Sequence, residues 1–284
     1  MKFSITNIAS YATQVLSSNT RGHIHSIYHK TINFQLNGYL LALQTKGSPL
    51  SPISLITNLD SIDFQKLGVQ SGDFVAITSR EVCIYTSNSI LHFNYSVSII
   101  FDSQLFPAQS FNYIHLLPSA LALSHTGGFR TIFLPNSNST PSNDQFFITA
   151  TAKQRILHCS AYISQFDYIN AANELVHLIG LGIGLTPSGD DFLCGVLAGL
   201  LLSDQFTHPF SIILKEKIRE NFQNTNDISG AFLTCALSSH FSKSVKDLPS
   251  ASCSKEILIS FEQIGHSSGM DTLCGIFYGL SLFQ

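Results

Sequence analysis

Residues 182–200 read GIGLTPSGDDFLCGVLAGL, and residues 265–280 read GHSSGMDTLCGIFYGL. Aligned at an offset of 80 positions, the segments 188–200 and 268–280 share eight identities in thirteen positions without a gap. Each copy runs from a glycine-containing loop through Ser-Gly-x-Asp into an apolar run. This pattern predicts a helix start followed by a buried helix. The repeat indicates one structural element that the chain uses twice.

The apolar part of each copy carries two glycines four positions apart, Gly195 with Gly199 and Gly275 with Gly279. Glycine costs about 1 kcal/mol relative to alanine in a helix interior, so another interaction must offset it. Close approach of a second backbone is the expected reason. We therefore predict that the two helices pack against each other about a pseudo-twofold axis, with their N-terminal loops near one another.

The Ser-Gly-x-Asp sequence also predicts how each helix begins. Ser188 and Ser268 are the expected N-caps, and Asp191 and Asp271 stand three residues later, where a capping-box acid belongs. Thr186-Pro187 offers an alternative cap followed by proline at the first helical position. Caps and close-packed glycines alone would explain much of the repeat without any chemistry, so a purely structural role stays open.

Two features favour a binding site instead. Loops of small residues precede both helix N-termini, where free N–H groups can bind an anion. Asp190 is a carboxylate beyond what capping needs, and near an anion it would have to hold a cation or a substrate N–H. A small substrate with amide and acid groups, or a divalent cation such as Mg²⁺, would suit this mixture. The predicted catalytic residues are Asp190, Asp191, Asp271 and His266, and the predicted substrate-binding residues are Gly184, Thr186, Ser188, Gly189, Ser267, Ser268 and Gly269.

The chain as a whole predicts an α+β protein. Region 1–145 is β-rich, with short strand-like runs separated by turn residues, which favours an antiparallel sheet or a small barrel. Region 146–284 is helical and carries both motifs. The expected strands are 23–36, 38–44, 73–78, 82–85 and 90–101, the expected helices are 147–168, 169–178, 212–222, 229–240 and 255–264, and 135–144 is an expected loop.

Composition narrows the classes of partner. Among 284 residues, 44% are apolar and only 12% are charged, so either other subunits cover part of the surface or uncharged polar residues build it. The net charge of −3, without a basic block, gives no support for nucleic acid or an anionic membrane as partner. With no export signal and no spanning segment, we expect a cytoplasmic protein whose six cysteines are free, buried thiols.

Several other residues are weaker candidates. The segment 125–130, HTGGFR, resembles a binding turn, although most Gly-Gly turns are only turns. Arg130, Lys153 and Arg155 are scarce cations that we expect to be solvated charges, with an anion site as the alternative. His23 and His25 share one face of a predicted strand and form a weak metal-ligand pair.

Segments 184–191 and 265–273, together with Gly195, resemble the AllH-type family, which includes a subunit of anaerobic oxamate carbamoyltransferase. The resemblance implies carbamoyl transfer between oxalurate and phosphate, giving oxamate and carbamoyl phosphate in allantoin breakdown. It also implies a complex with two other kinds of subunit. Two alternatives remain: a structural or regulatory subunit without catalytic residues, and a related enzyme acting on another small amide or carboxylate.

Overall fold

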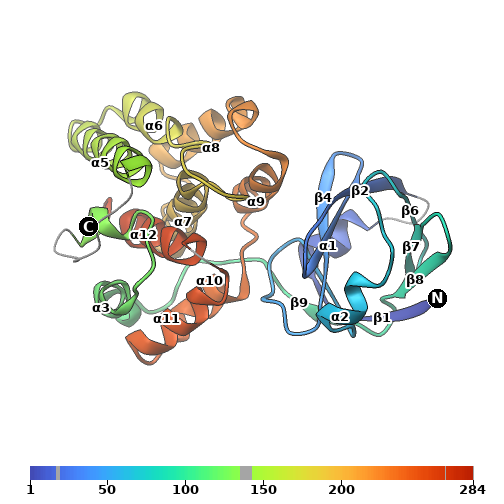
Figure 1. Cartoon of the computed structure of the whole chain (residues 1–284). Coiled ribbons are helices and arrows are strands. Elements are labelled where there is room, and N and C mark those ends of the chain that lie inside the picture. Colours follow the sequence, from blue (N-terminus) through green and yellow to red (C-terminus); the bar gives the residue numbers. More distant parts are fainter. Residues whose placement is uncertain (17–19, 135–142, 266, 284) are drawn as a thin grey trace. The chain divides into compact units, whose positions relative to one another are not determined.

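A computed structural model describes residues 1–16, 20–134, 143–265 and 267–283 (Figure 1). The chain forms two compact units. The first contains residues 1–104 and 240–243, and the second contains residues 105–239 and 244–284. The predicted loop 135–144 lies largely outside the described residues. No helix among those described is long and apolar enough to cross a lipid bilayer.

Unit 1 is a small β-barrel, the second of the two predicted arrangements. Its strand order is β5-β4-β3-β2-β6-β7-β8-β1-β9, and an additional antiparallel pairing of β1 with β5 closes eight of these strands. The neighbouring pairs are antiparallel except β4–β5, β1–β8 and β1–β9. The strands are β1 Lys2–Ala9, β2 Arg21–Ile27, β3 Thr31–Leu36, β4 Tyr39–Gln44, β5 Ser54–Thr57, β6 Phe74–Ile77, β7 Glu81–Tyr85, β8 Ile90–Asn94 and β9 Ile99–Phe101.

Local sequence explains several features of the barrel. The predicted strand 23–36 is two strands, because the chain turns between β2 and β3 at residues 28–30. Asn37 and Gly38 both have positive φ and join β3 to β4, as a two-residue hairpin loop requires. Short helices α1, Ser10–Val15, and α2, Ser61–Gln65, complete the unit, and Asp60 caps α2.

Unit 2 is helical, as predicted, but it begins well before residue 146. Residues 105–134 belong to this unit because their short helices pack against its C-terminal helices, so the compact units divide at Gln104. The helices are η1 Asn112–Leu116, α3 Leu117–Leu123, α4 Arg130–Phe133, α5 Asn143–Ser164, α6 Tyr168–Val176, α7 Ser188–Leu202, α8 Pro209–Glu220, η2 Phe222–Asn224, α9 Asp227–Leu237, α10 Lys243–Asp247, η3 Leu248–Ser250, α11 Ser254–Glu262 and α12 Ser268–Ser281.

The two motif helices, α7 and α12, pack directly against each other in unit 2 (Figure 1). Their backbones meet most closely at Gly195 and Gly275. A Cβ atom on Gly195 would lie 2.1 Å from the carbonyl oxygen of Thr272, and one on Gly275 would lie 2.0 Å from that of Phe192. Neither position has room for a side chain, which explains why glycine is needed there.

The second pair of glycines makes a similar but looser approach. A Cβ atom on Gly199 would lie 2.5 Å from the carbonyl oxygen of Ile276, and one on Gly279 would lie 2.6 Å from that of Val196. The two glycines of each pair stand 80 positions apart in the sequence. The two carbonyls that they approach also stand 80 positions apart, so each contact has a counterpart with the helices exchanged. These exchanged contacts are those expected of the predicted pseudo-twofold axis, which stays a prediction.

All six cysteines are free thiols. Cys83, Cys159, Cys235 and Cys274 are buried, Cys194 is partly buried, and Cys253 is exposed. The expectation of free thiols is thus confirmed, and burial holds for most but not all of them.

Candidate functional site

The N-terminal ends of α7 and α12 lie together, and a hydrogen bond joins the two motifs. The hydroxyls of Thr186 and Ser268 are 2.8 Å apart. The prediction that Ser188 and Ser268 are N-caps was wrong by one residue. They are the first helical residues, and Pro187 and Ser267 occupy the N-cap positions without a side-chain capping bond. The helix starts therefore leave the serine hydroxyls available for other partners.

Asp190 accepts hydrogen bonds from two loop segments, one that follows α6 and one that precedes α9. Its Oδ1 accepts from the backbone N–H of Gly180 at 2.9 Å, and its Oδ2 accepts a short hydrogen bond from the hydroxyl of Thr225. Burial raises the pKa of Asp190, and these donors oppose that rise. Gly180 has φ +75°, and a Cβ atom there would lie 2.2 Å from the carbonyl oxygen of Asn224. Asp190 thus has the environment of a structural residue.

Replacing Asp190 by alanine should lower the free energy of unfolding by about 1–3 kcal/mol, because the N–H of Gly180 and the hydroxyl of Thr225 would both lose a buried acceptor. Urea denaturation of the purified protein measures this. Asp63→Ala is the control, since it removes an exposed carboxylate paired with Lys66 at 3.5 Å. It should change the stability by less than about 0.5 kcal/mol. An Asp190→Ala protein as stable as this control would contradict the structural role.

Asp271 is fully buried beneath the loop that contains Gly128 and Phe129. Its Oδ1 accepts from the backbone N–H of Phe129 at 2.6 Å. Gly128 has φ +78°, and a Cβ atom there would lie 2.2 Å from Asp271 Oδ1. The HTGGFR segment is therefore not an isolated turn, because its second glycine lets the backbone close over the second motif. Its Arg130 is buried rather than solvated and donates to the carbonyls of Thr126 and Leu121.

Asp191 is the counterpart of Asp271 in the first motif, and its side chain is partly accessible. Its Oδ2 is buried and has no hydrogen-bond partner among the described residues, and the same holds for Oδ2 of Asp271. Burial raises the pKa of Asp191 well above its ordinary value, and the negative charge of Asp271 raises it further. The hydroxyls of Ser268 and Thr186 act in the opposite direction. The predicted capping-box role for these two acids is therefore replaced by a close carboxylate pair.

The pKa of Asp271 is raised to about 7, again mainly by burial. The N–H of Phe129 and the hydroxyls of Ser188 and Ser267 moderate this rise. Each carboxylate is thus influenced by hydroxyls of the opposite motif, Ser268 for Asp191 and Ser188 for Asp271. We call Thr186, Asp191, Ser267, Ser268 and Asp271 the paired-motif cluster.

Two predicted substrate-binding glycines have packing roles. A Cβ atom on Gly189 would lie 1.9 Å from the carbonyl oxygen of Leu178, and one on Gly269 would lie 1.9 Å from that of Phe261. The N–H of Gly189 donates to the carbonyl of Leu181 at 2.8 Å. These glycines let the preceding helix approach each motif closely.

The remaining predicted residues differ in accessibility. Gly184 is exposed with φ +118°, while Thr186, Ser267 and Ser268 are half-buried. Ser188 is buried. His266 lies outside the described residues. Of these residues, Thr186 and Ser268 lie close enough to Asp191 for their hydroxyls to lower its pKa.

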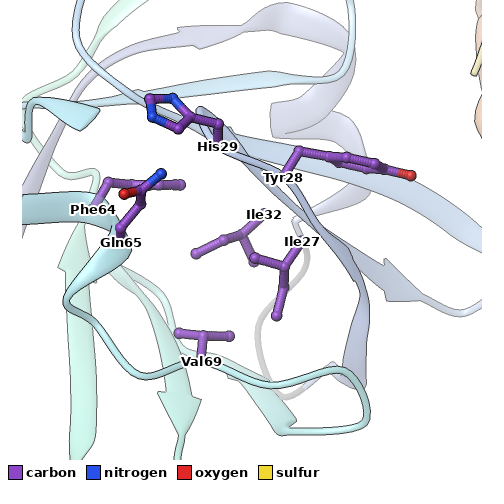
Figure 2. A pocket seen from close by; sticks show the side chains of 7 residues that line it. All are labelled: Ile27, Tyr28, His29, Ile32, Phe64, Gln65 and Val69. Carbon is purple, nitrogen blue, oxygen red and sulfur yellow. The ribbon is translucent and has the colours of Figure 1, made fainter. Parts of the chain in front are cut away.

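A separate pocket of about 310 Å³ lies in the barrel unit (Figure 2). It contains no acidic side chain, and apolar residues form most of its wall. The lining residues are Ile27, Tyr28, His29, Ile32, Phe64, Gln65 and Val69. Because it lacks paired ionisable groups, the paired-motif cluster is the stronger candidate site.

The fold and the cluster define a class of protein: an α+β chain with a small barrel unit and a helical unit in which a repeated helix start carries a buried carboxylate pair. Two family models match this chain. One, described as oxamate carbamoyltransferase subunit AllH, matches residues 178–280, and the other, described as the AllH family N-terminal domain, matches residues 4–100.

The chain belongs to the AllH family, since the two matches together cover most of it. The first match spans both motifs, and the second spans nearly the whole barrel, where sequence motifs offered little. The family description agrees with the main prediction, a carbamoyltransferase subunit. No solved structure matches the chain significantly.

Proposed function

We propose that this chain is a subunit of an oxamate carbamoyltransferase, and that its paired-motif cluster binds the amide part of the substrate. The observation that carries the proposal is a pair of buried oxygens, Oδ2 of Asp191 and Oδ2 of Asp271, for which the described part of the chain offers no hydrogen-bond partner. Burying an acceptor without a donor costs roughly 1–3 kcal/mol. Two unsatisfied buried acceptors at one site are expected where a bound ligand supplies the missing hydrogen-bond donors.

The chemistry of oxalurate fits this environment. Its ureide group offers N–H donors for carboxylate oxygens, and its carboxylate needs hydroxyl or N–H donors. The half-buried residues Thr186 and Ser268 act on Asp191, and half-buried Ser267 acts on Asp271, so their hydroxyls supply the second kind of group. Because the N–H groups of Gly189 and Ser268 already donate to backbone carbonyls, hydroxyls are better placed than these amides to hold an anion.

Carbamoyl transfer also needs a proton. A phosphate oxygen attacks the carbamoyl carbon of oxalurate, and the bond from that carbon to the oxamate nitrogen breaks. The leaving nitrogen takes up one proton to become the amide of oxamate. Burial and the neighbouring Asp271 raise the pKa of Asp191, which favours a protonated carboxyl able to donate it. We assign Asp191 this role, with Asp271 keeping its pKa high and His266 as an optional proton carrier.

The same two oxygens would also suit a divalent cation such as Mg²⁺, which prefers carboxylate oxygen ligands. Asp191 and Asp271 would hold it, and it would neutralise charge on the bound phosphate. In either case Asp190 contributes by fixing the start of α7 rather than by touching the substrate.

The cellular setting follows from the same proposal. The chain would act in the cytoplasm, in allantoin breakdown within purine metabolism, together with other protein subunits. The matching family model is described as an enzyme subunit, which supports other protein subunits as partners. A charged fraction of only 12% is consistent with a surface that is partly covered in a complex.

Asp191→Asn in the assembled complex tests the proposal. Carbamoyl phosphate formation should fall about a hundredfold, because asparagine cannot donate the proton, while the thermal stability of the subunit should not fall. The control is Asp63→Asn, an exposed acid in the barrel unit, which should keep wild-type turnover. Repeating the assay over a range of Mg²⁺ concentrations separates the cation role, since a lost cation ligand would be partly rescued by excess Mg²⁺.

A structural or regulatory subunit is the competing proposal, and one observation favours it. The motifs have a structural role without catalysis, because their glycines let α7 and α12 pack closely and Asp190 and Asp271 accept hydrogen bonds from neighbouring loops. Under this alternative the Asp191→Asn complex would turn over at the wild-type rate, and the catalytic assignment would be abandoned.

A further inference from the structure

Three potential metal ligands meet on the outer surface of the barrel, in the unit that the proposed function does not use. Cys83 on β7 pairs directly with His92 on β8, and Glu81 stands two residues before Cys83 on the same face of β7. Val82, between them, and Ile84, which follows Cys83, are fully buried, so the strand alternation directs Glu81 and Cys83 to the opposite face. Two adjacent strands thus fix all three side chains.

The ligand atoms converge. His92 Nδ1 lies 3.0 Å from Glu81 Oε2 and 3.5 Å from Cys83 Sγ, and Cys83 Sγ lies 4.0 Å from Glu81 Oε2. All three atoms lie within 4.8 Å of one another. Around tetrahedral zinc, with Zn–N and Zn–O near 2.0 Å and Zn–S near 2.3 Å, nitrogen and oxygen ligands lie about 3.3 Å apart and sulfur lies about 3.6 Å from either. The observed separations lie within about 0.4 Å of this spacing.

We propose that Glu81, Cys83 and His92 form a binding site for one zinc-class divalent ion, with the fourth position open to solvent. The ligand set of thiolate, imidazole and carboxylate is one that zinc accepts, whereas magnesium and calcium select oxygen ligands alone. His92 and Glu81 are 34% and 27% exposed, so an ion can reach them, and Cys83 is buried at 4%.

The geometry differs from that of a nucleophilic triad. In a Cys-His-acid triad one ring nitrogen faces the nucleophile and the other faces the acid. Here the same atom, His92 Nδ1, faces both Cys83 Sγ and Glu81 Oε2. A single nitrogen shared by two acceptors is the arrangement expected around a central cation.

Binding would release a proton. Cysteine binds a metal through its thiolate form. The metal therefore displaces the thiol proton to solvent as the sulfur–metal bond forms. Lys2 on β1 is in register with His92 and is a neighbouring positive charge, but it is exposed, and its long stem can turn the ammonium group into water.

Cobalt(II) titration of the metal-stripped, full-length protein tests the site, because a cobalt–thiolate bond gives a charge-transfer band in the near ultraviolet. We expect the band to saturate at one equivalent of cobalt and to disappear when zinc is added. Cys83→Ser should lose the band. Cys253→Ser removes an exposed thiol elsewhere in the chain and should keep it.

Affinity measurements on the other two ligands complete the test. His92→Gln and Glu81→Gln should retain the far-ultraviolet circular dichroism of the barrel but weaken zinc binding about a hundredfold or more, since even outer-sphere changes cost tenfold or more. Saturating zinc should raise the melting temperature of the wild type and leave that of Cys83→Ser unchanged. The proposal is overturned if the wild type shows no thiolate band, or if folded His92→Gln and Glu81→Gln bind zinc as tightly as the wild type. Neither result depends on carbamoyltransferase activity.

Discussion

Replacing Gly275 by alanine should lower the free energy of unfolding by about 3 kcal/mol or more, although it adds a single methyl group and raises helix propensity. The reason is the place where that methyl group would stand, 2.0 Å from the carbonyl oxygen of Phe192 and 2.9 Å from the Cα atom of Gly195. Both neighbours are backbone atoms of α7, so no side-chain rotation can relieve the clash.

The strain must be relieved by moving α7 away from α12. These helices form the centre of unit 2, and residues on both, such as Leu193, Val196, Leu273 and Ile276, are fully buried. A small separation would open gaps along the whole interface, because protein interiors are close-packed. Urea denaturation followed by circular dichroism measures the loss.

Gly230 provides a matched control. It lies within α9, as Gly275 lies within α12, but apart from its chain neighbours and its own helix backbone no described atom lies within 4 Å of the position its Cβ would take. Gly230→Ala should therefore raise the stability by up to about 1 kcal/mol. If Gly275→Ala changed the stability in the same direction as Gly230→Ala, close helix packing could not be the reason for this glycine.

The double substitution Gly195→Ala, Gly275→Ala sharpens the test. Each added methyl group would meet the opposite glycine, since a Cβ on either lies 2.9 Å from the Cα of the other. Once the first substitution has separated the helices, the second should cost less than it does alone. The two effects should therefore sum to more than the effect of the double variant, as expected for neighbouring sites.

Much of the helical unit was predictable because its signals are local. Four-residue glycine spacing in two copies led to the predicted pairing of α7 and α12, and the Ser-Gly-x-Asp motif located both helix starts to within one residue. The sequence did not distinguish an open sheet from a closed barrel, because closure depends on a distant pairing. Strand β1 pairs with β5 across some fifty residues, as in Ile5 with Thr57. Strand β1 itself, KFSITNIA, was missed because a register shift between Ile5 and Asn7 breaks the alternation of apolar and polar residues.

The candidate site shows the same division between local and distant partners. The acids were identified from the repeat, but their roles depend on residues far away in the chain. Asp271 accepts from Phe129, 142 positions earlier, and Asp190 accepts from Thr225, 35 positions later. One signal for the first contact was present, the glycine pair at 127–128, although nothing in the sequence linked it to Asp271.

The second large effect is expected in the pH dependence of stability. Asp271 has an ordinary pKa of 3.8, and burial in the folded protein raises it to about 7. Between these values the folded state keeps a proton that the unfolded state has released. The free energy of unfolding should therefore fall as the pH rises from about 4 to about 7, and this contribution should be constant above pH 7.

The size of the effect follows from the same pKa values. Each unit by which folding raises the pKa corresponds to about 1.4 kcal/mol, so Asp271 alone should destabilise the neutral-pH protein by an amount on the order of 4 kcal/mol relative to pH 4. Asp271→Asn should remove this contribution, because asparagine does not ionise and its Oδ1 can still accept from the N–H of Phe129. It should also lower the pKa of Asp191, whose rise depends partly on the charge of Asp271.

Urea denaturation of wild type and Asp271→Asn at several pH values between 4 and 8 measures this difference. The variant should be the more stable protein at pH 7.5, and the gap should close towards pH 4, where both side chains are neutral. Asp63→Asn, at an exposed position in α2, should follow the wild-type profile. Equal slopes for wild type and Asp271→Asn would show that Asp271 is ionised in the folded protein with its charge balanced, and a cation held between the two motifs would then be the simplest way to balance it.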